Sequence, residues 1–393
     1  MKIKVGVIFG GASVEHEVSI ITAVQAMQNI DTEKYEVVPI YISKNGTWYT
    51  GEILKKMETY KDFDSDKKYL KQVVLIKGKD AYELQKTTGL FRKVVNTIDI
   101  AFPMVHGKGV EDGSLAGYLE MLKIPYVGSN VLASSLGQDK VVQKQVLNSL
   151  GINTPKYTWF YDSEYQTDPG KIKKDVKMLG YPVIVKPANL GSSVGIKIAK
   201  DEKELDEAIM DAILYDEKII VEEMINNLME VNCAVLGNYE HQEVSSIVQM
   251  KTKHEFLTFE DKYIGGKKGK TKGKDSSSSM IIDAKLDKKL EDKIKNASVK
   301  TFKALGMSGV VRIDLLIDTK TNEVYVNEPN TIPGSLSFYM WKDKNYKKLL
   351  TEMISLSIKS YKNNFKKISS FDSNILSNYN GSKGIKGSKG KLG

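Results

Sequence analysis

Two short runs near residue 320 combine hard oxygen ligands with a guanidinium group. They read V-V-R-I-D-L-L-I-D over 310–318 and V-Y-V-N-E-P-N-T-I-P-G over 324–334, and both are patterned as strands. The side chains that could do chemistry are Arg312, Asp314, Glu328 and Asn330. Carboxylate and amide oxygens suit Mg2+, and Arg312, on the same side of a strand as Asp314, could stabilise the charge that develops in phosphoryl transfer. A polar-faced hairpin that ends in a Pro-Gly turn is the plainer alternative.

A second candidate is a phosphate-binding loop. Lys186 ends an apolar strand and is soon followed by G-S-S-V-G at 191–195. Glycines let the backbone approach a phosphate, the hydroxyls of Ser192 and Ser193 can donate to it, and a fixed lysine supplies a point charge. The run is neither a Walker A loop nor G-x-G-x-x-G. An ordinary glycine hairpin beside a surface lysine therefore stays open.

Acidic residues follow two further strands. The run I-I-V-E-E-M-I at 219–225, with Glu230 shortly after it, could offer backbone to an adenine edge and a carboxylate to a ribose, or could be a solvated acidic loop. Glu15 lies in the Gly-Ser loop after the first strand, where the dipole of the next helix also explains it. His106 follows another strand and is more typical of a residue that orders its loop than of a base.

The bulk composition is that of an ordinary globular protein. Of 393 residues, 41% are hydrophobic and 27% charged, and no apolar run reaches the roughly 18 residues of a membrane span. Much of the net charge of +9 lies in Gly/Ser/Lys segments at 262–274 and 381–393, so no nucleic-acid partner is indicated. The single cysteine, Cys233, excludes a disulfide framework, and we expect a cytoplasmic protein without a membrane partner.

The first part of the chain alternates strand and helix patterns, which predicts a parallel sheet with functional loops at the carboxyl ends of its strands. The expected strands are 2–11, 35–42, 98–107 and 124–129, with a helix at about 18–30. Segment 50–95 is weaker and is interpreted as a peripheral insertion. In a second unit from Gln138 onward, we expect helices at 139–150, 201–214 and 287–305 and strands at 181–187, 217–225 and 229–237.

Taken together, these motifs resemble those of the D-alanine–D-alanine ligases, members of the ATP-grasp superfamily. Over roughly residues 2–360 they read G-G-A-S-V-E-H-E-V-S, H-G-K-G-V-E-D-G-S-L-A-G-Y-L-E, V-G-S-N-V-L-A-S-S-L-G-Q-D-K, V-I-V-K-P-A-N-L-G-S-S-V-G, V-E-E-M-I, V-V-R-I-D and N-E-P-N-T-I-P-G. The resemblance implies an α/β protein in which an ATP-grasp fold follows a Rossmann-like parallel-sheet N-terminal domain. The expected units are 1–137, 138–224 and 225–365, with a mobile loop at 255–282 and a basic low-complexity tail at 366–393.

The resemblance also implies which residues bind ATP and metal. The matching ATP-binding residues are Lys140, Lys186, Ser193, Glu222, Glu223, Ile225, Glu230 and Lys262. Of these, Lys140 and Lys186 would contact the phosphates, the 222–225 segment the adenine, and Glu230 the ribose. The ligands of two Mg2+ or Mn2+ ions would be Asp314, Glu328 and Asn330.

The activity implied by the resemblance is the ATP-dependent joining of two D-alanines for peptidoglycan precursors. The matching catalytic residues are Glu15, Ser192, Tyr263, Arg312 and Gly334. Glu15, hydrogen-bonded with Ser192 and Tyr263, would receive the ammonium of the first D-alanine. Arg312 and the Gly334 amide would stabilise the oxyanion when the second amine attacks an acyl phosphate.

The run after N-T-I-P-G departs from the family pattern. A serine that holds the carboxylate of the second substrate is expected nine residues after Asn330, where this chain has Tyr339, with Ser337 nearby. These two residues would form the second-substrate pocket. The second substrate could therefore be D-serine, D-lactate or another molecule in place of D-alanine, although Tyr263 argues against D-lactate. A non-ligating ATP-binding regulatory protein is an alternative from another class, and the family is compatible with a homodimer.

Overall fold

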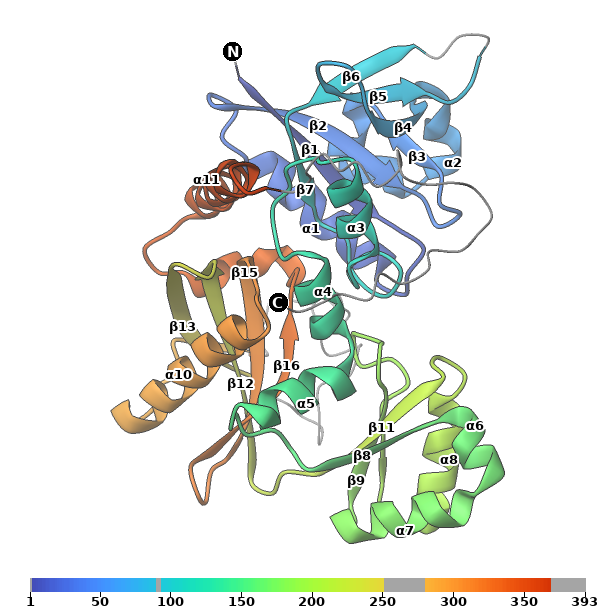
Figure 1. Ribbon diagram of the computed structural model, residues 1–393, viewed down its shortest axis with the longest axis vertical. Coiled ribbons are helices and arrows are strands. Elements are labelled where there is room, and N and C mark those ends of the chain that lie inside the picture. The colour runs from blue at the N-terminus through green and yellow to red at the C-terminus, as the bar shows by residue number, and fades with distance from the viewer. Residues whose placement is uncertain (1, 90–92, 251–279, 369–393) are drawn as a thin grey trace, which may run out of the picture.

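The computed structural model describes residues 2–89, 93–250 and 280–368, and these form three units, each built on its own sheet (Figure 1). The N-terminal unit and the five-stranded sheet are neighbours, and the four-stranded sheet lies at the far end of the molecule. Lys262 and Tyr263 lie outside the described residues. No helix in the described ranges is long and apolar enough to cross a membrane.

The N-terminal sheet has seven strands in the order β6-β5-β4-β3-β2-β1-β7. Its strands are β1 (Ile3–Gly10), β2 (Tyr35–Ile42), β3 (Trp48–Thr50), β4 (Lys71–Lys77), β5 (Tyr82–Lys86), β6 (Val94–Ile98) and β7 (Ile100–Pro103). Only β2, β1 and β7 pair in parallel, since helix α1 (His16–Asn29) provides the crossover between β1 and β2. The predicted parallel sheet is therefore confirmed for the strands at 2–11, 35–42 and 98–107, and the other four strands of the sheet, which that prediction did not include, pair antiparallel.

Segment 50–95 is not a peripheral insertion, because β4, β5 and β6 extend the same sheet by antiparallel pairing. The short helices before β4 are η1 (Glu52–Lys55), η2 (Met57–Tyr60), α2 (Phe63–Asp66) and η3 (Lys67–Tyr69). The run at 124–129 forms only a single parallel bridge, between Tyr126 and Ala101, in place of the predicted strand. Helix α3 (Ser114–Met121) precedes it.

The second sheet is antiparallel throughout, in the order β10-β9-β11-β8. Its strands are β8 (Tyr157–Tyr161), β9 (Val183–Pro187), β10 (Lys197–Ala199) and β11 (Lys218–Glu223), and its helices are α6 (Asp162–Thr167), α7 (Pro169–Leu179) and α8 (Glu202–Ala212). Helix α8 begins where the Asp201 carboxylate accepts the Glu204 N–H. Apolar residues of α7 and α8, such as Val176 and Ile209, are buried against the strands.

The third sheet has the order β14-β13-β12-β15-β16 and is covered by α10 (Figure 1). Its elements are β12 (Leu228–Gly237), β13 (Gln242–Met250), β14 (Met280–Ile282), α10 (Lys288–Ala304), β15 (Gly309–Asp318), β16 (Glu323–Asn330), η4 (Gly334–Met340) and α11 (Tyr346–Phe365). Helices α4 (Val131–Gln138) and α5 (Lys140–Ser149) lead from the first unit to the second. The β15–β16 register pairs Asp314 with Glu328 but Leu315 with Val326, so Asn327 is the extra residue of a β-bulge.

One hydrophobic core joins the first unit to the third. Phe9 and Ala23 of the N-terminal unit share it with Met340 of η4 and with Leu349 and Leu350 of α11, and all five are fully buried. Burial of apolar surface from both units stabilises their relative placement. Helix α1 is therefore held in place against η4 and α11, which matters for the site described below.

We expect Gly309→Ala to destabilise this junction. Gly309 has a φ of +82°, and an added Cβ would lie 3.1 Å from the Gly128 Cα. A left-handed backbone combined with a backbone clash should lower the free energy of unfolding by about 2–4 kcal/mol. Gly46→Ala is the matched control, since its φ is +80° but nothing lies within 4 Å of its Cβ position. Urea unfolding followed by circular dichroism measures both, and equal losses would rule out an effect of the Gly128 contact.

Candidate active site

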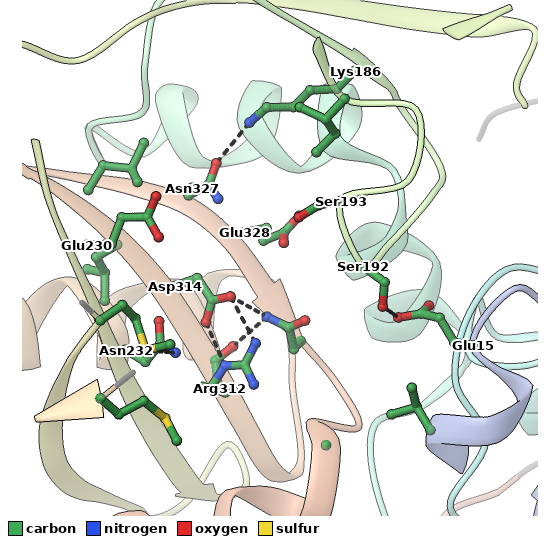
Figure 2. Close-up of a pocket in the computed structure, with 18 of the residues that line it drawn as sticks. Glu15, Lys186, Ser192, Ser193, Glu230, Asn232, Arg312, Asp314, Asn327 and Glu328 are labelled. Carbon is green, nitrogen blue, oxygen red and sulfur yellow. Dashed lines mark hydrogen bonds and ion pairs between the residues drawn. The ribbon is translucent and has the colours of Figure 1, made fainter. Parts of the chain in front are cut away.

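A cavity of about 340 Å³ lies where the three units meet (Figure 2). The loop before α1, the β9–β10 loop, the β11–β12 connection and the β15–β16 pair all contribute to its walls. The predicted residues that line it are Glu15, Lys186, Ser192, Ser193, Ile225, Glu230, Arg312, Asp314, Glu328, Asn330, Gly334 and Tyr339. Residues that are far apart in the chain are thus brought to one place, as expected for a binding site.

The β15–β16 pair carries the most polar wall. Arg312 donates from Nε to Asp314 Oδ1 at 2.7 Å and from Nη2 to Oδ2 at 2.9 Å, while Asn330 Nδ2 donates to Oδ2 at 3.1 Å (Figure 2). Glu328 faces Asp314 in the strand register. Asn232 on β12, which sequence patterns did not single out, donates to Asp314 Oδ1 at 3.2 Å in the amide orientation that satisfies both of its polar atoms.

These donors fit a magnesium site that is completed by a ligand. Two carboxylates and one amide are oxygen donors of the kind that Mg2+ prefers, and this cation commonly takes its remaining ligands from phosphate or water. Glu328 Oε2 lies 3.1 Å from the Nζ of Lys140, and Asp314 is paired with Arg312, so each carboxylate already has a protein cation beside it. Among the described residues no group of three His, Cys, Asp or Glu could hold a metal, so Asn330 and a ligand would have to complete the coordination.

The glycine-rich loop after β9 closes over Glu15. The Ser192 hydroxyl donates to the Glu15 carboxylate, and both side chains are buried (Figure 2). A Cβ at Gly191 would lie 2.7 Å from Glu15 Oε2, so a glycine is needed for this approach. Ser192 and Ser193 have φ values of 55° and 60°, a left-handed conformation that the surrounding contacts must maintain. The loop predicted to bind phosphate therefore also encloses a buried carboxylate that could receive an ammonium group.

Lys186 lines the cavity, but the two glutamates predicted near the nucleotide do not. Lys186 Nζ donates to Glu222 Oε2 at 2.8 Å and to Asn327 Oδ1 at 3.2 Å. Glu223 accepts the Lys156 N–H at 2.8 Å. Both carboxylates have protein partners and do not line the cavity, and the roles of Glu222 and of the 223–225 backbone beside the adenine stay predictions.

Another part of the cavity is an apolar slot. Ile184, Ile225, Leu228 and Leu316 line it, and Glu230 lies beside them, opposite Leu316 in the β12–β15 register. An apolar slot with a carboxylate at one side could hold a planar base and the hydroxyls of its sugar. The strand pattern predicted Ile225 and Glu230, whereas the partners from distant strands could not be read from the sequence.

Glu111, in the run H-G-K-G-V-E-D-G-S, is a half-buried acid with no predicted role. It accepts the Gly107 N–H at 3.0 Å, the Thr331 hydroxyl at 3.1 Å and the Ile332 N–H at 3.0 Å. Burial, and then the charge of Glu15, raise its pKa to about 7. Glu111 thus fastens the loop after β7 to the turn after β16.

His106 orders its loop, which is the role that the sequence favoured over that of a base. It is buried, its Nε2 lies 3.2 Å from the Thr22 hydroxyl, and burial lowers its pKa to about 4. The ring is therefore neutral at physiological pH and is poorly suited to act as a cation.

The two residues predicted for a second-substrate pocket are placed differently. Tyr339 lines the cavity, but Ser337 is fully buried and does not line it. The reason is a turn in which Ser335, Leu336 and Ser337 all have φ near +50°, which directs Ser337 into the protein. The prediction of Ser337 as a pocket residue is therefore wrong.

Glu111→Gln should change the pH dependence of stability. The folded-state pKa of about 7 lies above the ordinary value of 4.5, so the native state keeps a proton that the unfolded chain releases. The contribution of this carboxyl is full below about pH 4.5 and is lost as the pH rises to about 7. Urea unfolding at several pH values gives the free energy of unfolding of both proteins. The value for the unsubstituted protein minus the value for the variant should decrease as the pH rises from about 4.5 to about 7. A constant difference would contradict a raised pKa.

Comparison with known proteins agrees with this geometry. Family models described as "D-ala D-ala ligase N-terminus" and "D-ala D-ala ligase C-terminus" match residues 4–129 and 146–355. The D-alanine–D-alanine ligase of Thermosipho melanesiensis is 43% identical over 378 residues, which cover 95% of this chain and 98% of the relative.

Two solved structures are similar over nearly the whole chain. The VanG D-Ala:D-Ser ligase from Enterococcus faecalis has a TM-score of 0.76 at 32% identity, covering 91% of this chain and 100% of its own. The D-alanine–D-alanine ligase from Bacillus anthracis complexed with ATP has a TM-score of 0.63 at 26% identity, covering 92% of this chain and 99% of its own. The predicted ATP-grasp fold is confirmed. Both halves of the cavity lie inside the regions that the family models match. The chain belongs to the D-alanine–D-alanine ligase family.

Proposed function

We propose that this enzyme joins two molecules of D-alanine, with consumption of ATP, to give D-alanyl-D-alanine for peptidoglycan precursors. The observation that carries the proposal is that one cavity contains both the Glu15–Ser192 pair and the Arg312–Asp314 pair. The first is a buried anion suited to an ammonium group, and the second joins a cation ligand to a fixed guanidinium. The B. anthracis relative was solved with ATP, and the T. melanesiensis relative is named a D-alanine–D-alanine ligase.

In this proposal ATP lies between the apolar slot and the β15–β16 wall. Its base would lie near Ile225, its ribose near Glu230, and its phosphates near Lys140, Lys186 and Ser193. Lys140 belongs to this set because its Nζ reaches Glu328 at 3.1 Å and donates to the Leu190 carbonyl at 2.7 Å. Lys262 and Tyr263 stay predictions.

Two Mg2+ or Mn2+ ions are part of the proposal, held by Asp314, Glu328 and Asn330. Bound there, the ions would neutralise charge on the phosphates of ATP. The support is the oxygen donor set, with Asp314 and Glu328 at facing register positions.

The reaction follows from the charges of these residues. A carboxylate is a poor electrophile, so ATP would first convert the first D-alanine to an acyl phosphate. Glu15, held by Ser192, would bind the ammonium of that substrate. When the amine of the second D-alanine attacks the carbonyl, Arg312 and the Gly334 N–H would stabilise the oxyanion until phosphate leaves.

A second candidate function is the same chemistry with D-serine or another D-amino acid as second substrate. Tyr339 lines the cavity where the family pattern predicts a serine, and the E. faecalis relative is named a D-Ala:D-Ser ligase. A non-ligating regulatory protein is disfavoured, because Glu15, Arg312 and Asp314 are all retained around one cavity.

Further parts of the description stay predictions. They are a cytoplasmic location, a homodimer, and the unit boundaries at 1–137, 138–224 and 225–365 with a tail at 366–393.

The experiment that tests the function is phosphate release from Mg-ATP with D-alanine alone, then with D-alanine plus D-serine, D-lactate or other amino acids, with products identified by mass. We expect D-alanyl-D-alanine from D-alanine alone. Turnover only with a second amino acid would move the assignment to the D-serine type of ligase and implicate Tyr339. No phosphate release with any pair would overturn the ligase proposal.

Arg312→Ala should abolish turnover and spare ATP binding. Removal of an oxyanion donor in a buried site lowers kcat by roughly 100- to 1000-fold. Steady-state kinetics and direct titration with Mg-ATP separate the two effects. Lys320→Ala, at an exposed position after β15, is the control for loss of a positive charge. Comparable turnover in Arg312→Ala would exclude the oxyanion role.

A further inference from the structure

A buried lysine that no sequence motif singled out lies behind the nucleotide side of the cavity. Lys144 on α5 is fully buried and does not line the cavity. Its Nζ lies 3.2 Å from Glu222 Oε1 and donates to the Asn327 carbonyl at 3.3 Å. Glu222, with a side chain only 1% exposed, pairs through Oε2 with Lys186 at 2.8 Å. One carboxylate is therefore shared by two ammonium groups, of which only that of Lys186 faces the cavity.

The cluster connects elements on both sides of the cavity. Lys186 and Glu222 belong to β9 and β11 of the four-stranded sheet, whereas Asn327 belongs to β16 of the five-stranded sheet. Asn327, at the bulge, accepts two hydrogen bonds from lysines. Its side-chain oxygen accepts from Lys186 at 3.2 Å, and its carbonyl accepts from Lys144 at 3.3 Å. Figure 2 shows the Lys186–Asn327 contact at the cavity wall. The position of Lys186 thus depends on both sheets.

The charges of the cluster do not cancel. Two ammonium groups and one carboxylate leave one positive charge in a buried setting. Burial opposes ionisation of Glu222, but Lys144 and Lys186 outweigh it and hold its pKa below the ordinary value. Burial also opposes the charge of Lys186, but Glu222 outweighs it and raises the pKa of Lys186. Burial lowers the pKa of Lys144 and, together with the charge of Lys186, outweighs the opposing effect of Glu222.

We propose that Lys144 is a positioning residue that makes the charge of Lys186 available to ATP. By sharing Glu222, Lys144 leaves this carboxylate only partly available to neutralise Lys186, whose side chain lines the cavity. The inference rests on the proposed function, in which Lys186 contacts the phosphates of ATP. Without Lys144, Glu222 would pair with Lys186 alone and would compete with the phosphates of ATP for the ammonium group of Lys186.

The test is Lys144→Met, which keeps the length of the side chain and removes its charge. Loss of a buried charge partner should raise the KM for ATP about tenfold or more and weaken Mg-ATP in direct titration, with the KM for D-alanine unchanged. The double variant Lys144→Met with Glu222→Gln removes one charge of each sign and should bring the KM for ATP back to within about threefold of the starting value. A residue that only fills space would show no such rescue.

Two further variants make the result specific. Lys156→Met is the matched control, because its side chain is 79% exposed and it pairs with Glu223 at 4.0 Å, so the KM for ATP should not change. Lys144→Gln repeats the test if Lys144→Met does not fold, since it keeps a donor for the Asn327 carbonyl.

Lys186→Met separates the proposed role of Lys144 from the assignment of Lys186 to the phosphates of ATP. If Lys186→Met raises the KM for ATP and Lys144→Met does not, the role of Lys144 is overturned and the ATP site stands. If Lys144→Met raises the KM for ATP and the added Glu222→Gln does not bring it back down, Lys144 acts through packing and the charge-sharing role is overturned. If neither single variant has an effect, the assignment of Lys186 to the phosphates fails as well.

Discussion

The register between β15 and β16 is the constraint on which the site depends. It places Asp314 opposite Glu328 and Arg312 opposite Asn330, so four functional groups lie on one wall without any loop to position them. The bulge at Asn327 then shifts the register, and the side-chain oxygen of this residue accepts from Lys186 of β9 while its carbonyl accepts from Lys144 of α5. A slip of one residue would turn the functional side chains to the opposite face. Strand pairing therefore does the positioning that loops do in many enzymes.

Several carboxylates around the cavity each have at least one cationic side chain as a partner. Asp314 has Arg312, Glu328 has Lys140, and Glu222 has two lysines. Unpaired, any of these groups would be costly to bury. The same arrangement suits a ligand that carries both phosphates and cations, because phosphate can take over the lysines while cations take over the carboxylates. Stability of the protein and affinity for a charged ligand then have a common electrostatic basis.

The first unit contributes chemistry only because it is fixed to the third. The shared core holds α1 against η4 and α11, and Glu111 ties the loop after β7 to Thr331 and Ile332. Glu15 is thereby held at the same cavity as Arg312, although nearly 300 positions separate them in the chain. Local patterns could not show this contact, because burial of apolar surface between distant segments determines it.

Local patterns were enough to identify the family, the strands that carry most of the predicted site residues, and most of the polar residues that line the cavity, since ordered motifs and hydrophobic periodicity are local properties. The segment 50–95 was misjudged, because its strands obtain their register from neighbours that no local pattern reveals. The sequence placed Ser337 in the pocket, whereas three consecutive left-handed residues bury it. It gave Lys144, Asn232 and Glu111 no role, because their partners come from other strands and loops. Only the tertiary structure decides such contacts, since a buried charge or amide is defined by the distant groups that pair with it.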